Sequence, residues 1–105
     1  MIANTPVPPY YAVIFTSLMT KPSESYHEMA DSMLMHAQQQ EGFLGFEHAR
    51  EQAGITVSYW ASLEAIQAWR QHSEHQKAIK KGRSTWYNAY KVRICKVTRD
   101  YDAEK

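Results

Sequence analysis

The sequence predicts an α+β fold in which one sheet packs against helices, and two observations lead to this expectation. Strand-like patterns cover residues 10–17, 43–50 and 55–61 and lie again within 88–99, and in residues 55–61 successive residues alternate with the period of a strand. Apolar residues recur at helical spacing in residues 26–40 and 63–81. The resulting order is strand, helix, strand, strand, helix, strand, which is the order of the ferredoxin-like fold.

The N-terminal part of the chain gives an arm and the first two elements of this order. Residues 1–9 contain three of the four prolines, so we expect an extended arm. The first strand has apolar residues on both faces, which predicts that both faces of the sheet are covered. The first helix presents a stripe that includes Tyr26, Met29 and Met33, and Gly42 is expected to end it as a C′ residue.

The C-terminal half is marked by local capping and turn residues. Gly54 is expected at positive φ in the hairpin between the second and third strands. Ser62 is expected to cap the second helix, which we expect to be kinked and to close at Gly82. In the last strand the apolar pattern changes parity between Ile94 and Cys95, which predicts a bulge or a change of face there.

Composition narrows the class of partner and the cellular location. The 12 basic and 11 acidic residues give a net charge of +1, and this near balance argues against a nucleic-acid-binding surface. No apolar run approaches the ~20 residues that cross a membrane. Cys95 is the only cysteine and no leader-like pattern opens the chain, so we expect a cytoplasmic protein without an internal disulfide.

Two histidines stand out on the second helical segment. His72 and His75 are spaced so that they share one face of a helix, a spacing that suits metal or haem binding. No third ligand follows at a fixed spacing, so we expect no metal site. His75 is the stronger candidate for a general acid or base, or for an axial haem ligand, because a neutral imidazole near pH 7 suits both tasks.

Three motifs together resemble a known family. They are Y-W-x-S-x-E-A-I-x-A-W from Tyr59, an H-x-x-H within the next ten residues, and G-R-x-x-W-Y from Gly82. They resemble the antibiotic biosynthesis monooxygenase (ABM) domain family of the dimeric α+β barrel superfamily, and the upstream P-P-Y-Y-A-V-I-F and E-G-F-L-G-F-E fit the same family. The likeness divides the chain into an arm (1–9), an ABM-like domain (10–101) and a tail (102–105). It implies a homodimer in which a second subunit covers the outer face of the sheet.

The resemblance also implies a function and a set of site residues. It implies a cofactor-independent monooxygenase that oxidises a small aromatic or polycyclic substrate with O₂ in an apolar pocket. We expect the catalytic residues to be His75, Trp69 and Tyr59. We expect the substrate to be bound by Trp60, His48, Arg83, Trp86 and Tyr87. Buried tryptophans equally suit a structural core, so that interpretation stays open.

Other functions remain open beside this one. The chain also suits a non-catalytic module that binds haem or an apolar metabolite, or an oligomerisation domain whose own side chains fill its interior. A haem-degrading branch of the resembled family needs an Asn on the first strand and a His ten residues after the Trp. This sequence has no Asn in residues 10–17, and Ile79 stands where that His is expected.

Overall fold

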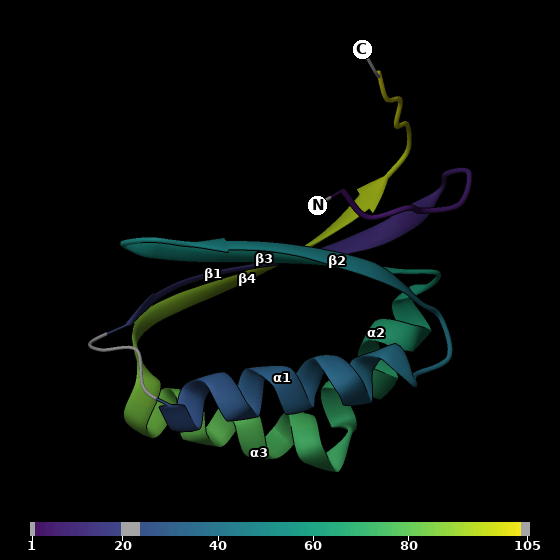
Figure 1. The fold of residues 1–105 in the computed structure, drawn as a ribbon. Coiled ribbons are helices and arrows are strands. Elements are labelled where there is room, and N and C mark those ends of the chain that lie inside the picture. Colours follow the sequence, from purple (N-terminus) through teal and green to yellow (C-terminus); the bar gives the residue numbers. More distant parts are fainter. Residues whose placement is uncertain (1, 20–23, 104–105) are drawn as a thin grey trace.

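Four antiparallel strands form one sheet, and the helices pack on one side of it (Figure 1). The computed structural model describes residues 2–19 and 24–103. The elements, in chain order, are β1 (Tyr10–Met19), α1 (Glu24–Gln38), β2 (Phe43–Arg50), β3 (Ala53–Trp60), α2 (Leu63–Gln71), α3 (Ser73–Lys81), η1 (Gly82–Trp86) and β4 (Tyr87–Val97). The strands lie in the order β2-β3-β1-β4. This confirms the ferredoxin-like arrangement.

The sheet has an inner face toward the helices and an outer face away from them. Tyr11 pairs with Trp60 across β1 and β3, and Trp60 contacts α2, so both residues belong to the inner face. Because side chains alternate along a strand, Tyr10 and Tyr59 lie on the outer face. Figure 1 shows both termini at the same end of the sheet, on its outer side.

The second helical segment consists of two separate helices, not of one kinked helix. Ser62 caps α2 by accepting a hydrogen bond from the Ala65 amide at 3.1 Å, as predicted. α2 then ends, His72 takes an extended conformation, and α3 begins at Ser73. α3 ends at Lys81 with Gly82 as its C-cap, as predicted, but the backbone of Gly82 stays helical and continues into the π-helical turn η1.

The glycines and bulges differ in part from expectation. Gly42 has φ +87°, as a C′ residue requires. Gly54 does not have positive φ, so that prediction was wrong, and its small size serves another purpose described below. The irregularity in the β1–β4 pairing lies at Leu18/Met19, not between Ile94 and Cys95. The expected bulge is therefore at the opposite end of β4.

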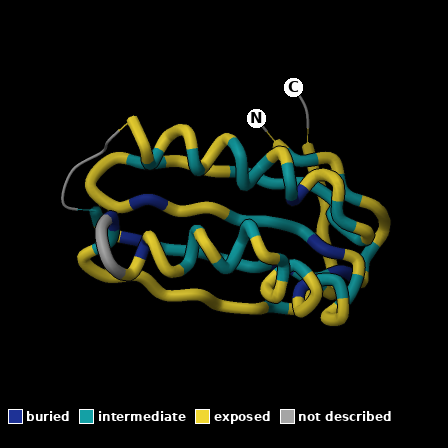
Figure 2. Tube along the Cα trace, turned by 90° about the horizontal axis from the view of Figure 1, so that it is seen from below, coloured by how far each residue is buried: buried dark blue, intermediate teal, exposed yellow. Residues whose placement is uncertain are grey.

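Few side chains are fully buried. The buried apolar residues among those described are Tyr10, Ala12, Ala37, Trp60, Ile66 and Trp86. The side chains that line the inner face and the inward stripe of α1 remain partly exposed, among them Val13, Phe15, Phe46, Met29 and Met33. In Figure 2 most of each helix is teal or yellow and the dark-blue segments are short. Apart from Trp60 and Ser17, many inner-face side chains are thus incompletely covered.

Part of the outer face is apolar and exposed. Leu18 is 47% exposed and Ile55 is 46% exposed, and the half-buried Ile14 and Val57 lie beside them. We call these four residues the outer patch. Within the described residues, every helix is too short or too polar to span a bilayer.

Candidate active site between the sheet and the helices

Three aromatic rings stack in a row from the sheet to α3. The ring centroids of Trp60 on β3 and Trp69 on α2 are 6.2 Å apart, and those of Trp69 and His75 on α3 are 4.6 Å apart. The planes of Trp69 and His75 differ by only 12°. The structure therefore brings together three of the residues that the sequence predicted.

The hydrogen bonding of His75 sets which ring nitrogen can act as a base. Its Nδ1 lies 3.1 Å from the backbone carbonyl oxygen of Trp69. A carbonyl oxygen only accepts hydrogen bonds, so Nδ1 carries the hydrogen and the neutral ring keeps its lone pair on Nε2. Burial lowers the pKa of His75, which outweighs the raising effect of the Trp69 carbonyl. The imidazole is accordingly neutral at neutral pH, with Nε2 able to accept a proton.

His72 has a different task from His75. Its Nδ1 accepts a hydrogen bond from the Glu74 amide at 3.2 Å, so His72 caps α3. Its ring also lies 5.6 Å from that of His36 on α1. No group of three or more His, Cys, Asp or Glu side chains within the described ranges is arranged to hold a metal ion.

A second aromatic cluster lies at the other end of the sheet. Phe15 on β1 contacts Tyr87 and Tyr90 of β4, with centroids 5.3 and 5.6 Å apart. Tyr26 of α1 packs edge-on against both Trp86 and Tyr87. Burial and a hydrogen bond with Tyr26 raise the pKa of Tyr87 above its ordinary value, so its hydroxyl stays protonated at neutral pH. Two more predicted residues, Trp86 and Tyr87, therefore meet here.

The remaining predicted binding residues lie at exposed positions. Arg83 is exposed, and its Nε donates to the Tyr90 hydroxyl at 2.8 Å. His48 is exposed on β2 and stacks on Phe46 with centroids 5.6 Å apart. Neither contacts the stack that contains His75.

Tyr59 lies on the outer face, away from the other predicted catalytic residues. Its hydroxyl donates to Glu47 Oε1 at 2.7 Å, and the Ala3 amide of the N-terminal arm donates to Glu47 Oε2 at 2.9 Å. These two donors lower the pKa of Glu47. Burial and the Glu47 carboxylate raise the pKa of Tyr59 to about 12. The structure therefore does not bring Tyr59 together with His75 and Trp69.

Sequence reasoning missed one inner-face cation, Arg50 at the end of β2. Its Nη2 donates to the hydroxyl of the buried Ser17, and its guanidinium carbon lies 5.9 Å from the centre of the Tyr26 ring. The pattern of β2 places Arg50 on the same face as Phe46 and His48. This position on the apolar face could have identified Arg50 from the sequence, because a cation on an apolar face needs a polar or aromatic partner.

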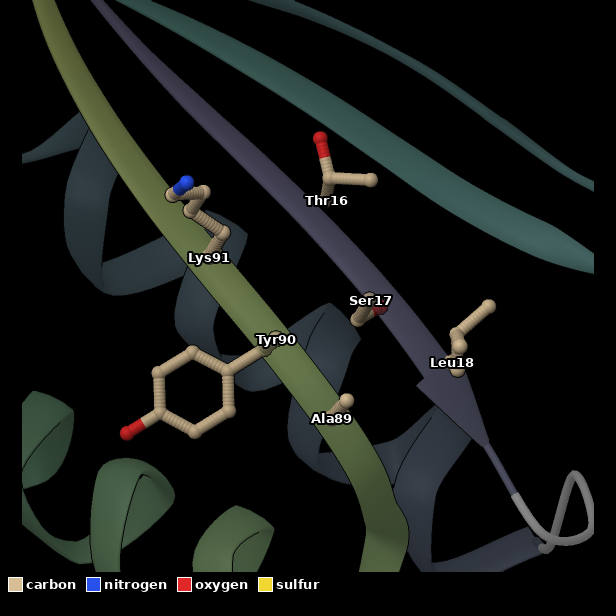
Figure 3. A pocket seen from close by; sticks show the side chains of 6 residues that line it. All are labelled: Thr16, Ser17, Leu18, Ala89, Tyr90 and Lys91. Carbon is tan, nitrogen blue, oxygen red and sulfur yellow. The ribbon is translucent and has the colours of Figure 1, made fainter.

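Two hollows lie outside the interior between the sheet and the helices. One, of about 220 Å³, is lined by β1 and β4; Figure 3 shows Thr16 and Lys91 on the outer side of these strands and Tyr90 pointing toward the helices. The other, of about 480 Å³, is a groove between α1 and α3. Trp86 lines the groove, and its indole nitrogen is buried without a hydrogen-bond partner.

The chain resembles several known proteins in sequence and fold. It is 53% identical over 100 residues to YqjZ, an uncharacterised protein of Bacillus subtilis, and the match covers 93% of this chain and 88% of that protein. The fold is similar to that of SnoaB, a cofactor-independent oxygenase from Streptomyces nogalater (TM-score 0.77, 10% identity, 92% of this chain and 100% of that one). It is also similar to Rv0793 from Mycobacterium tuberculosis (TM-score 0.75, 12% identity, 90% and 99%). The sequence profile of the antibiotic biosynthesis monooxygenase family matches residues 11–81. The chain therefore belongs to the antibiotic biosynthesis monooxygenase family.

Proposed function

We propose that this protein is a cofactor-independent monooxygenase that oxidises a small aromatic or polycyclic molecule with O₂ between the sheet and the helices. The observation that carries the proposal is His75, a neutral imidazole stacked on Trp69 with its Nε2 lone pair available. Family membership supports the proposal, as does the shared fold with SnoaB, which is described as a cofactor-independent oxygenase.

The chemistry asks for a base and an apolar, planar surface. Nε2 of His75 removes a proton from an activated CH₂ group of a phenolic substrate, which leaves an enolate. The enolate transfers one electron to O₂, and the two radicals combine to a peroxide that takes the proton back from His75. Loss of water then converts the CH₂ into a carbonyl, so one oxygen atom enters the product and the other leaves as water.

The aromatic side chains suit the binding of such a substrate. Trp69 is partly exposed and offers apolar surface beside His75, and the fully buried Trp60 supports it from behind. Aromatic pairs of this kind contribute about 1 kcal/mol beyond the area they bury. Trp86 and Tyr87 supply apolar surface at the far end. We place Arg83 and His48 at the rim, since both are exposed.

Oxygen uptake tests the proposal directly. With a hydroxylated anthrone as substrate, we expect uptake above the rate without protein, and a loss of about a hundredfold in His75→Gln. His27→Gln is the matched control, because His27 is exposed on α1. A panel of phenolic polycyclic probes that shows no protein-dependent uptake would refute the proposal, as would full activity in His75→Gln.

The haem-binding alternative uses the same nitrogen, so it needs its own readout. Nε2 of neutral His75 could also bind the iron of haem. A titration with haemin, followed at the Soret band, tests this alternative. A stoichiometric shift that disappears in His75→Gln, together with no uptake of O₂ with any probe, would replace the oxygenase by a haem-binding module.

A further inference from the structure

Arg50 is an inner-face cation without a carboxylate partner. Within residues 2–19 and 24–103, the one ion pair joins Lys77 to Glu74 at 3.4 Å, and no acidic group pairs with Arg50. Its contacts are the Ser17 hydroxyl and the face of the Tyr26 ring. A guanidinium that faces an apolar interior normally has an anionic partner, because an unpaired charge is costly there.

The local backbone is shaped to hold this guanidinium. Gly54 lies opposite Arg50 on β3, and a Cβ added to Gly54 would lie 2.0 Å from Nη2 and 2.5 Å from Nε of Arg50. Only glycine leaves that space, and Gly54 has no positive φ that would give it another purpose. The guanidinium can therefore lie over Gly54 because Gly54 has no side chain.

The remaining N–H groups of Arg50 have no acceptor among the described residues. Within residues 2–19 and 24–103 the structure gives an acceptor only for Nη2, so Nε and Nη1 make no hydrogen bond there. Guanidinium N–H groups in this fork geometry suit two oxygen atoms of one anion.

The position of Arg50 relates it to the proposed substrate site. Gly54 and Trp60 lie at opposite ends of β3, six residues and about 20 Å apart at the usual rise of a strand. Arg50 is thus at the far end of the interior from the stack of Trp60, Trp69 and His75. A group bound to Arg50 cannot be the atom that reacts at His75.

We propose that Arg50 binds an anionic oxygen, of a carboxylate or an ionised phenol, at the remote end of an elongated aromatic substrate. This inference rests on the proposed function for the role of the substrate, but the anion site itself does not depend on catalysis. Arg83, the arginine expected from the sequence, is exposed and bonds to Tyr90 instead. Arg50 is then a specificity-determining residue, which selects acidic substrates over neutral ones of the same shape.

Calorimetric titration with three probes tests the anion site without any turnover. The probes are anthracene carboxylate, the matching carboxamide, and hydroxyanthracene titrated on both sides of its own pKa. We expect the carboxylate to bind about tenfold more tightly than the carboxamide, and Arg50→Met to abolish that preference. Arg99→Met is the matched control and should keep the preference, because Arg99 is exposed and also lies over a tyrosine ring, that of Tyr101. If only the ionised hydroxyanthracene shows the preference, the anion is a phenolate.

Gly54→Ala separates positioning from folding. The added methyl group meets only the flexible end of the Arg50 side chain, so the fold should persist while the guanidinium moves. We expect a loss of anion preference close to that of Arg50→Met, with an unchanged circular dichroism spectrum. Arg50→Lys should recover part of it, because the charge stays but the fork is lost.

The failures of the two proposals are distinguishable. Equal affinity of the wild type for the carboxylate and the carboxamide, together with equal affinity for the neutral and ionised hydroxyanthracene, would overturn the anion site. Loss of the preference in Arg99→Met instead of Arg50→Met would also overturn it. Uptake of O₂ with neutral anthrones would then leave the oxygenase intact. Conversely, an Arg50-dependent preference in a protein that consumes no O₂ would retain the anion site and refute the oxygenase.

Discussion

His75 shows how its surroundings set the chemistry of one side chain. Burial disfavours the charged imidazolium, and Arg70 and His72 add a smaller repulsion, so the pKa of His75 falls below its ordinary value. The Trp69 carbonyl fixes the hydrogen on Nδ1. The stacked ring and this carbonyl belong to the same residue, so Trp69 both holds the imidazole and leaves its other nitrogen as the base.

The lowered pKa of His75 predicts a pH dependence of stability. Between the folded pKa and the ordinary value of about 6.5, the unfolded chain binds a proton at His75 that the folded chain does not. The free energy of unfolding should therefore fall as the pH falls through this window. Urea unfolding at several pH values, in the wild type and in His75→Gln, measures this contribution. An identical slope in both proteins would contradict the assignment.

At the scale of the elements, two glycines with different roles join the strands to their neighbours. Gly42 enters β2 with φ +87°, and a Cβ there would lie 2.7 Å from that of Ala65 on α2. Its backbone carbonyl also accepts a hydrogen bond from the Ala61 amide at 2.7 Å. Gly42 therefore fixes the approach of α2 to the end of α1. Gly54 has no such backbone demand and provides only space.

This difference predicts unequal costs for the same substitution. Gly42→Ala should lower the free energy of unfolding by about 2 kcal/mol, since it combines a left-handed backbone with a contact to another Cβ. Gly54→Ala is the control and should cost well under half as much, because only the Arg50 side chain must move. Chemical denaturation of both variants gives the comparison. Equal losses would show that the backbone at Gly42 is not the cause.

The same elements show what sequence reasoning reaches. Ser62 and Gly42 were predicted correctly because capping is local, and a few neighbouring residues decide it. Gly54 was misassigned because its reason is Arg50, which becomes its neighbour only through the β2–β3 register.

The periodicity of the sequence predicted the order of the strands and helices, but it did not always predict which site residues lie together. Tyr59 and Trp60 were both expected at one site, although consecutive residues of a strand point to opposite faces. The stack of Trp69 and His75 depends on the break at His72, where the sequence predicted only a kink.

At the scale of the whole molecule, the chain exposes more surface than its size requires. Its accessible surface is 7689 Å², whereas a compact monomer of 12.2 kDa exposes about 6,100 Å². The excess includes the outer patch. The N-terminal arm covers the neighbouring part of the outer face, where the Ala3 amide donates a hydrogen bond to Glu47. A second copy seated on the patch would bury part of the excess.

We therefore expect a homodimer in solution that uses the outer patch. Ile55→Lys should convert it to a monomer, because a charge would be buried at the contact. Leu63→Lys is the matched control, since Leu63 is 50% exposed on α2, outside the patch. Sedimentation velocity measures both. A monomeric wild type, or dissociation by Leu63→Lys alone, would exclude this interface.

The position of β4 at the edge of the sheet bears on the solubility of the protein. An edge strand offers unpaired backbone groups to other copies, and this one also exposes Val92 and Ile94. A net charge of +1 gives little overall repulsion between molecules. Protection against edge-to-edge aggregation falls instead to the cations along the strand, Lys91, Arg93 and Lys96. We expect these three side chains to disfavour pairing between the edges of two copies, and salt that screens their charges to weaken this effect.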